Sequence, residues 1–211
     1  MDYAKMNKKS EDVLVVLTDM ENVAECYLKK WKNRDKELFD NLNSDNIEEQ
    51  KKAISKIFSK YKVARNFFKE FDVDAKIQRE RFFHAFDTFV QLDEGDFPKL
   101  EEERANLVWS ITKVSEDLSE VYGKRKLLSA TTKLLWFKFR DQILIYDSQV
   151  VSALKLNDDN IISFYMNWYK AFDGKKAEIE KACKKLSEPV ANELWFHKRV
   201  FDLYLWERGK K

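Results

Sequence analysis

Apolar side chains recur at intervals of three and four residues along most of the chain, which is the spacing of helices with one buried face. The clearest series runs over residues 13–31, with others over 47–68, 77–90, 100–121 and 194–206. Only 4 glycines and 2 prolines are present, whereas the turns of a sheet-rich fold need both. We therefore expect an all-α fold, a single multi-helix globular domain.

Capping and stop signals predict where these helices begin and end. The expected helices are one from Ser10 to about Asn33, a short one over 35–42, and a third over 47–69. Further on, the residues 157–160 are expected to cap a helix that stops near Asp173–Gly174, a lysine-rich helix follows over 175–186, and Pro189 lies in the first turn of the last helix.

The segment Asp93–Pro98, DEGDFP, is the clearest punctuation in the chain. It divides an N-terminal helical part, 1–97, from a C-terminal helical part, 98–211. We expect the two parts to form one compact unit, as two helical subdomains that meet at a cleft.

Composition and charge narrow the class of protein. Hydrophobic residues make up 44% and aromatic residues 14%, which indicates a folded globule. The formal net charge is only +2, so overall charge does not imply polyanion binding. Cys26 and Cys183 lie far apart in helical patterns, and no signal-like or membrane-length apolar segment is present. We expect a cytoplasmic protein that does not contact a membrane, with both thiols free and packed.

A local basic run stands out in the segment 123–156. From Gly123 to Arg140 the basic residues are Lys124, Arg125, Lys126, Lys133, Lys138 and Arg140, and no acidic residue interrupts them. Helical spacing predicts a core stripe over 127–135 and an opposite face that carries Ser129, Lys133, Trp136 and Phe137. Small residues beside a lysine leave room for another backbone, either a helix or a phosphate chain.

Lys133 and Asp147 each allow more than one interpretation. Lys133 has three interpretations. It is an exposed lysine whose aliphatic stem covers Trp136 and Phe137, or it contacts a phosphate, or it is the charged partner of Asp147. Asp147 precedes an apolar helical series beginning at Val150, which is the position of an N-cap. A carboxylate at a helix N-terminus is also held rigidly, so capping and catalysis are compatible.

Metal binding is not expected. The two histidines, His84 and His197, are more than a hundred residues apart, and neither belongs to a recognisable metal-binding motif. We interpret both as structural or surface residues, and no cofactor is implied.

A family resemblance enters at the segment Ile145–Ser148, IYDS. Together with Ser129–Phe137, SATTKLLWF, and with Arg199, Asp202, Leu205, Trp206 and Gly209 near the end, it resembles bacterial proteins of the oxoguanine-type glycosylase fold. These proteins lie near the helix-hairpin-helix DNA glycosylases. The resemblance covers about residues 118–156 and the final helix. It implies a glycosylase-like helical arrangement, with Asp147 at the position of the aspartate that begins the helix after the hairpin.

The hairpin itself departs from the glycosylase pattern. Those enzymes carry a glycine-rich hairpin that offers backbone amides to a phosphate, whereas here Gly123 is followed by Lys124, Arg125 and Lys126. Lysine charge would substitute for the missing amides. Bifunctional glycosylases also have a nucleophilic lysine just inside the second hairpin helix, and residues 127–129 contain none. Lyase chemistry is therefore not expected.

The resemblance implies a DNA-binding protein with monofunctional base excision. Asp147 would be the catalytic carboxylate, and Lys124, Arg125, Lys126 and Lys133 would face phosphate. Trp136, Phe137 and Tyr146 would line a pocket for the flipped base, although core packing is the more general role of such aromatics. The alternative is a non-enzymatic helical interaction protein with a protein partner, a component of a bacterial multi-protein system.

Overall fold

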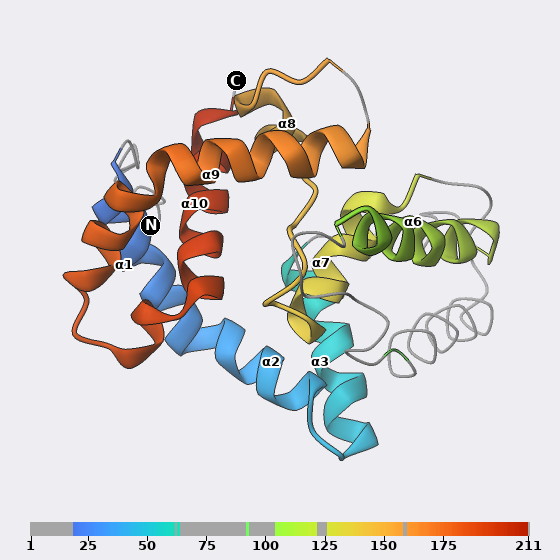
Figure 1. Cartoon of the computed structure of the whole chain (residues 1–211). Helices are drawn as coiled ribbons and strands as arrows, with labels where there is room; N and C mark the ends of the chain where they lie inside the picture. Colours follow the sequence, from blue (N-terminus) through green and yellow to red (C-terminus); the bar gives the residue numbers. More distant parts are fainter. Residues whose placement is uncertain are drawn as a thin grey trace, which may run out of the picture.

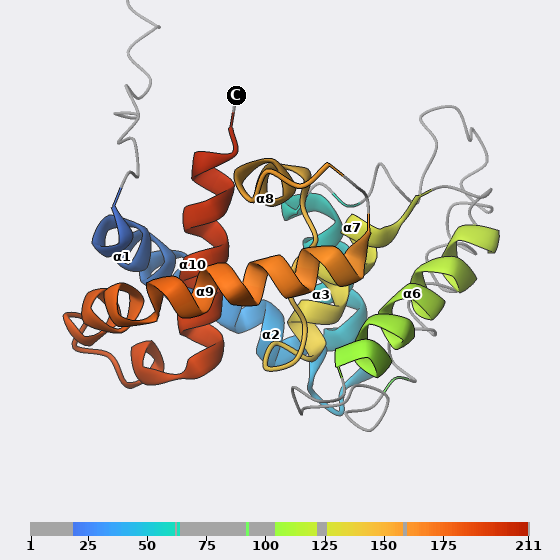
Figure 2. The ribbon, with the colours of Figure 1, turned by 45° about the horizontal axis from the view of Figure 1, so that its top comes forward.

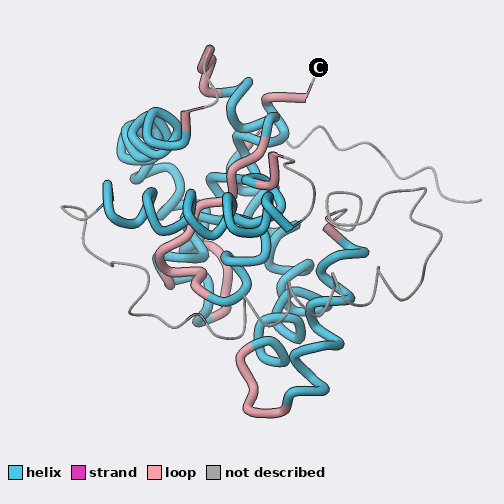
Figure 3. Tube along the Cα trace, turned by 90° about the vertical axis from the view of Figure 1, so that its right-hand side faces the viewer, coloured by secondary structure: helices cyan, strands magenta, loops and turns pink. Residues whose placement is uncertain are grey.

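The described residues form helices joined by loops. The computed structural model describes residues 19–61, 63, 92, 104–121, 126–157 and 160–210. Within these ranges no residue lies in a β-strand (Figure 3). The expectation of an all-α fold is confirmed.

The first helices are continuous rather than separate. Helix α1 spans Met20–Lys30 and begins after Asp19, whose carboxylate accepts the Asn22 amide at 2.9 Å. A π-helical turn, Trp31–Asp35, then leads directly into α2, Lys36–Leu42. The predicted end near Asn33 is therefore wrong. Both Trp31 and Asp35 are buried, which the wider π turn permits within one helical rod. The predicted start at Ser10 lies outside the described residues.

Helix α3 is shorter than predicted. It spans Ile47–Lys60, and the Asn46 side chain caps its first turn. The predicted extension to residue 69 is wrong, because Tyr61 is a turn residue and Val63 is not helical. The Val63 amide donates to the Phe58 carbonyl at 2.9 Å, a hydrogen bond of the Schellman type that closes helices. The predicted helix over 77–90 and the punctuation at 93–98 lie outside the described residues.

Helix α7, Leu128–Lys138, is buried on most of its circumference. The predicted core stripe is indeed buried, but so are Trp136 and Phe137 on the face expected to be open. Helix α6, Arg104–Val121, packs along one side of α7, and α2 packs against another. Figure 1 shows α7 at the centre of these neighbours. Lys133 and Ser129 are the half-buried residues of the face predicted to be open.

The C-terminal half contains one long helix where two were predicted. Helix α8 spans Ser148–Ala153, and α9 runs without interruption over Ile161–Lys184. The predicted stop at Asp173–Gly174 is wrong. A single glycine weakens a helix by only about 1 kcal/mol relative to alanine. Phe172 and Ile179 on either side of it are buried and hold both halves of α9 to the core.

The last helix begins later than predicted. Pro189 opens a separate 3-10 turn, Pro189–Asn192, and α10 spans Leu194–Arg208. As expected, α10 is buried on much of its surface. It crosses α9 steeply, and its C-terminal end lies beside α8 (Figures 1 and 2).

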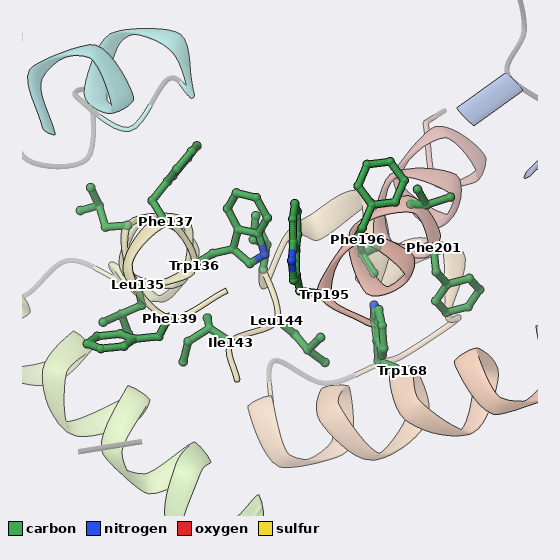
Figure 4. Close-up of a cluster of buried hydrophobic side chains, with 14 of the residues drawn as sticks. Leu135, Trp136, Phe137, Phe139, Ile143, Leu144, Trp168, Trp195, Phe196 and Phe201 are labelled. Atoms are coloured by element: carbon green, nitrogen blue, oxygen red, sulfur yellow. The ribbon is translucent and has the colours of Figure 1, made fainter. Parts of the chain in front are cut away.

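Aromatic side chains fill the space between α7, α9 and α10 (Figure 4). Trp136 of α7 and Trp195 of α10 have ring centroids 6.5 Å apart. Trp168 of α9 packs edge-on against Phe201 of α10 at 5.2 Å. Such pairs add to the hydrophobic stabilisation and favour one arrangement of the helices.

Two further expectations concern the cysteines and membranes. Both cysteines are free, but only Cys183 is buried, and Cys26 is exposed, so the expectation of two packed thiols is wrong for Cys26. Among the helices of the described ranges, none has the length and apolar character that crossing a bilayer requires.

Candidate functional site

Lys133 and Asp147 form an ion pair between α7 and the start of α8. Lys133 Nζ lies 2.9 Å from Asp147 Oδ2, and the two side chains retain 20% and 18% of their exposure. Lys133 Nζ also donates to the Ser129 hydroxyl at 3.2 Å, one turn earlier in α7. Among the interpretations of Lys133 given above, the structure shows the one in which Lys133 is the charged partner of Asp147.

Asp147 caps α8 at the same time. Its Oδ1 accepts the Gln149 amide at 3.1 Å, which confirms the predicted N-cap. One carboxylate oxygen is thus bound to a backbone amide and the other to an ammonium group. The carboxylate is fixed in orientation but not sealed from solvent.

A threonine aligns the two segments that carry the pair. The Thr132 hydroxyl accepts the Tyr146 amide at 3.0 Å and donates to the Leu128 carbonyl at 3.0 Å. On the other side, the Leu144 amide donates to the buried Tyr165 hydroxyl at 2.9 Å. The segment before Asp147 is therefore held between α7 and α9, which brings Asp147 to Lys133.

The end of α10 fixes the start of α8. A Cβ on Gly209 would lie 1.8 Å from the Gln149 carbonyl oxygen, so the backbones of the two segments touch. Here glycine is needed for a close approach and not for an unusual φ. The contact supports the turn in which Asp147 receives the Gln149 amide.

A second ion pair lies behind the first and was not identified from the sequence. Arg199 and Asp202 of α10 are both buried and hydrogen-bonded to one another. Burial raises the pKa of Asp202 to about 6; Arg199 opposes the shift, the negative charge of Asp147 adds to it, and Lys133 also opposes it. The sequence feature that could have indicated this pair is the spacing of Arg199 and Asp202, three residues apart in a largely apolar helix. The two ion pairs therefore interact electrostatically.

A small cavity adjoins the buried pair. It measures about 10 Å³, room for one water-sized group, and Arg199, Asp202 and Trp136 are among its lining residues. The Arg199 guanidinium lies 5.2 Å from the Trp136 ring centroid. The cavity is too small for a nucleobase.

The three aromatic candidates occupy different environments. Phe137 is fully buried between Trp136 and Tyr61, with ring centroids 4.9 and 5.0 Å away. Trp136 is buried and lines the small cavity. Tyr146 is half-buried next to Asp147 and packs edge-on against Phe164 at 5.0 Å. Of the three, Tyr146 is the one beside the Lys133–Asp147 pair with part of its side chain exposed.

The basic run is not gathered into one patch among the described residues. Lys124 and Arg125 lie outside them, and Lys126 is exposed just before α7. Arg140 lies in the turn that follows α7. Its guanidinium lies 3.7 Å from the Phe39 ring centroid and 4.2 Å from that of Trp195.

A further charged cluster surrounds the π turn. The buried Asp35 accepts hydrogen bonds from Tyr61 at 2.6 Å and from Arg34 at 2.8 Å. Lys30 lies 3.9 Å from the same carboxylate. Burial lowers the pKa of Lys30 to about 8, and the charge of Arg199 contributes further. The cluster links α1, α2 and α3 and is distinct from the Lys133–Asp147 pair.

Metal ligands are not assembled within the described part of the chain. No group of three or more histidine, cysteine, aspartate or glutamate side chains there could hold a metal ion. His197 has a ring nitrogen 2.8 Å from the Ala191 carbonyl, which is a structural contact at the start of α10. His84 lies outside the described residues.

The chain was compared with known proteins, and no protein-family model, no curated protein and no solved structure matches it.

Proposed function

We propose that the chain binds DNA and hydrolyses the bond between a base and its deoxyribose, with Asp147 at the reacting sugar. The observation that carries the proposal is the 2.9 Å ion pair between Asp147 and Lys133, which remains partly open to solvent. Its two residues come from the segments SATTKLLWF and IYDS, which carry the resemblance to the glycosylase fold.

The arrangement suits a reaction in which positive charge develops on the sugar. As the glycosidic bond breaks, C1′ and the ring oxygen acquire oxocarbenium character, which a nearby carboxylate stabilises. Asp147 then accepts the proton of the attacking water, whose oxygen bonds to C1′, while the base leaves with the bonding electrons and takes up a proton. Lys133 holds the carboxylate in place.

Lysine and arginine at the start of α7 supply the DNA contacts in this proposal. Lys126 is exposed just before α7, and Lys133 lies within α7, where its ammonium group pairs with Asp147. Lys124 and Arg125 come directly before them in the sequence. Each phosphate contact releases counterions, so binding should weaken steeply with salt.

The experiment measures base release and binding together. Duplexes containing uracil, hypoxanthine or 8-oxoguanine are incubated with the wild type, Asp147→Asn and Asp141→Asn. Asp141 is an exposed aspartate near the end of α7 and serves as the matched control. We expect Asp147→Asn to lower base release by about 100-fold or more while binding stays within about twofold, and Asp141→Asn to change neither.

The form of the product tests the monofunctional chemistry. Released base should appear with an intact abasic site that breaks only on alkali treatment, and borohydride should trap no covalent complex. Absence of base release from all three duplexes, together with no DNA binding at low salt, would falsify the proposal.

One observation favours the alternative, a helical interaction protein. Ile162 and Met166 lie four residues apart on one face of α9 and are 49% and 63% exposed. Exposed apolar side chains at this spacing are suited to a partner helix. Light scattering after size exclusion tests this reading: self-association that Met166→Glu abolishes would support it, and a monomer at high concentration would count against a self-complementary interface.

A further inference from the structure

A second, larger cavity lies at the C-terminal end of α8, opposite to the end that Asp147 caps. It measures about 540 Å³ and is bounded by the C-terminal end of α8, the middle of α9 and the last turns of α10. Among the described lining residues, Leu154 is half-buried and apolar, Phe201 and Leu205 lie beneath it and are nearly fully buried, and Lys155, Lys175 and Arg208 are charged. This is the size range of small-molecule sites.

The charged lining residues that the structure describes are all basic. These described residues include three basic side chains and no acidic one. Lys175 also pairs with Glu178 at 2.6 Å. Arg208 donates to the Tyr204 hydroxyl at 3.0 Å, and neither it nor Lys155 has a carboxylate partner among the residues that the structure describes. Lys155 and Arg208 therefore favour an anionic group at the cavity.

Lys155 occupies a backbone position that normally belongs to glycine. Its φ is 55°, in the left-handed region. The Lys155 amide donates to the Ser152 carbonyl and the Leu156 amide to the Val151 carbonyl, so the end of α8 is a Schellman motif. Glycine would meet the needs of this turn with less strain. A lysine here places a cation at the cavity instead.

Lys155 is a non-glycine residue where glycine would fit better, and Gly174 is the opposite case, a glycine where another residue would fit better. It lies in the interior of α9, where alanine would be more stable, and a Cβ at this position would meet nothing within 4 Å. Neither packing nor an unusual φ requires glycine there. Its position in the cavity lining does supply a reason, because a side chain at 174 would project into the open space.

Lys155 follows α8 and Gly174 lies within α9, and both residues line the same cavity. We propose that this cavity binds an amphipathic anion, with a phosphate head near Lys155 and Arg208 and an aliphatic body on the floor formed by Leu154, Phe201 and Leu205. This inference is independent of the proposed action on DNA.

Calorimetry on the full chain tests the ligand class with three probes. Dodecyl phosphate, below its micelle concentration, should bind, whereas inorganic phosphate and dodecyltrimethylammonium should bind at least about tenfold more weakly. Equal binding of inorganic phosphate would assign a simple anion site and overturn the amphipathic ligand. Equal binding of the cationic detergent would overturn the role of the basic rim.

Two substitutions separate ligand binding from folding. Lys155→Gly removes the cation and suits the left-handed backbone, and Gly174→Leu fills the open space. Both should leave the melting temperature unchanged or higher, while Lys155→Gly weakens dodecyl phosphate binding about tenfold and Gly174→Leu abolishes it. The matched controls, Lys184→Ala and Lys176→Leu, change exposed positions of α9 that do not line the cavity.

The proposal fails if dodecyl phosphate does not bind at millimolar concentration. It also fails if binding is the same in Gly174→Leu as in Lys176→Leu. Because no DNA is present in these titrations, either result leaves the action on DNA to its own experiment.

Discussion

The Thr132 hydroxyl accepts the Tyr146 amide at 3.0 Å and so joins α7 to the loop before α8. Residue 133, next to this threonine, and residue 147, next to this tyrosine, form the ion pair at the candidate site. The position of the pair therefore depends on an uncharged hydrogen bond one residue away. Thr132 itself is fully buried.

Thr132→Val removes the acceptor for the Tyr146 amide with little change of shape. A half-buried amide without its partner costs about 1–3 kcal/mol, so the free energy of unfolding should fall by that amount. Chemical denaturation measures the change. Thr112→Val is the control, because among the described residues the Thr112 hydroxyl bonds only the Val108 carbonyl of its own helix. An equal loss in both variants would contradict the bridging role.

A double-mutant cycle measures the coupling between Lys133 and Asp147. Lys133→Met and Asp147→Asn, alone and combined, should give a coupling energy of about 1 kcal/mol, since the pair is only partly shielded from solvent. The same cycle on the exposed pair Lys175–Glu178 should give a smaller value. A coupling energy near zero would mean that the pair contributes orientation but no stability.

Gly209→Ala should destabilise the protein. The added methyl would lie 1.8 Å from the Gln149 carbonyl oxygen, so α10 and α8 must move apart. Overpacking of this kind costs about 1–3 kcal/mol. In contrast, Gly174→Ala should stabilise by about 0.5–1 kcal/mol, because its Cβ meets open space in a helix interior. Thermal denaturation of both variants checks the opposite signs, and a neutral Gly209→Ala would show that the two segments separate easily.

Lys30 should release its proton at unusually low pH. Burial lowers the pKa of its amine to about 8, below the ordinary 10.5. Between these values the unfolded chain holds a proton that the folded chain has lost, so this group makes the free energy of unfolding rise with pH, and the contribution is lost as pH falls through about 8.

Competitive labelling with an amine-reactive reagent checks the Lys30 prediction. At pH 8, Lys30 should react as a partly deprotonated amine, with the exposed Lys29 as the reference amine on the same helix. The wild type should gain stability over Lys30→Met as pH rises from 8 to 10.5. A difference that stays flat across this interval would show that burial does not shift the pKa of Lys30.

Local features were the most accurately predicted from the sequence. The caps at Asp147 and Asn160 depend on a short side chain reaching amides two or three residues on, and both form as predicted. The apolar spacing of the last helix likewise predicted its burial. These features depend on neighbours in the chain, which the sequence contains directly.

Features that depend on contacts between distant segments were predicted less well. α3 ends at Lys60, and the side chain of the next residue, Tyr61, bonds Asp35 across 26 positions. α9 continues past Gly174 because both of its halves pack on the core. The open face expected on α7 is covered by other helices. At the candidate site, Asp147 was identified, whereas the Arg199–Asp202 pair behind it depends on how α10 crosses the molecule.

The π turn at Trp31–Asp35 determines which face of α2 points toward the core. An α-helix advances about 100° per residue, and the π turn takes up one extra residue within the helical rod. If its five residues wound as ordinary α-helix, α2 would rotate by roughly 100°, and Leu38 and Leu42, now buried, would turn toward solvent. Between α1 and α2, the number of residues therefore constrains the chain more tightly than their identity.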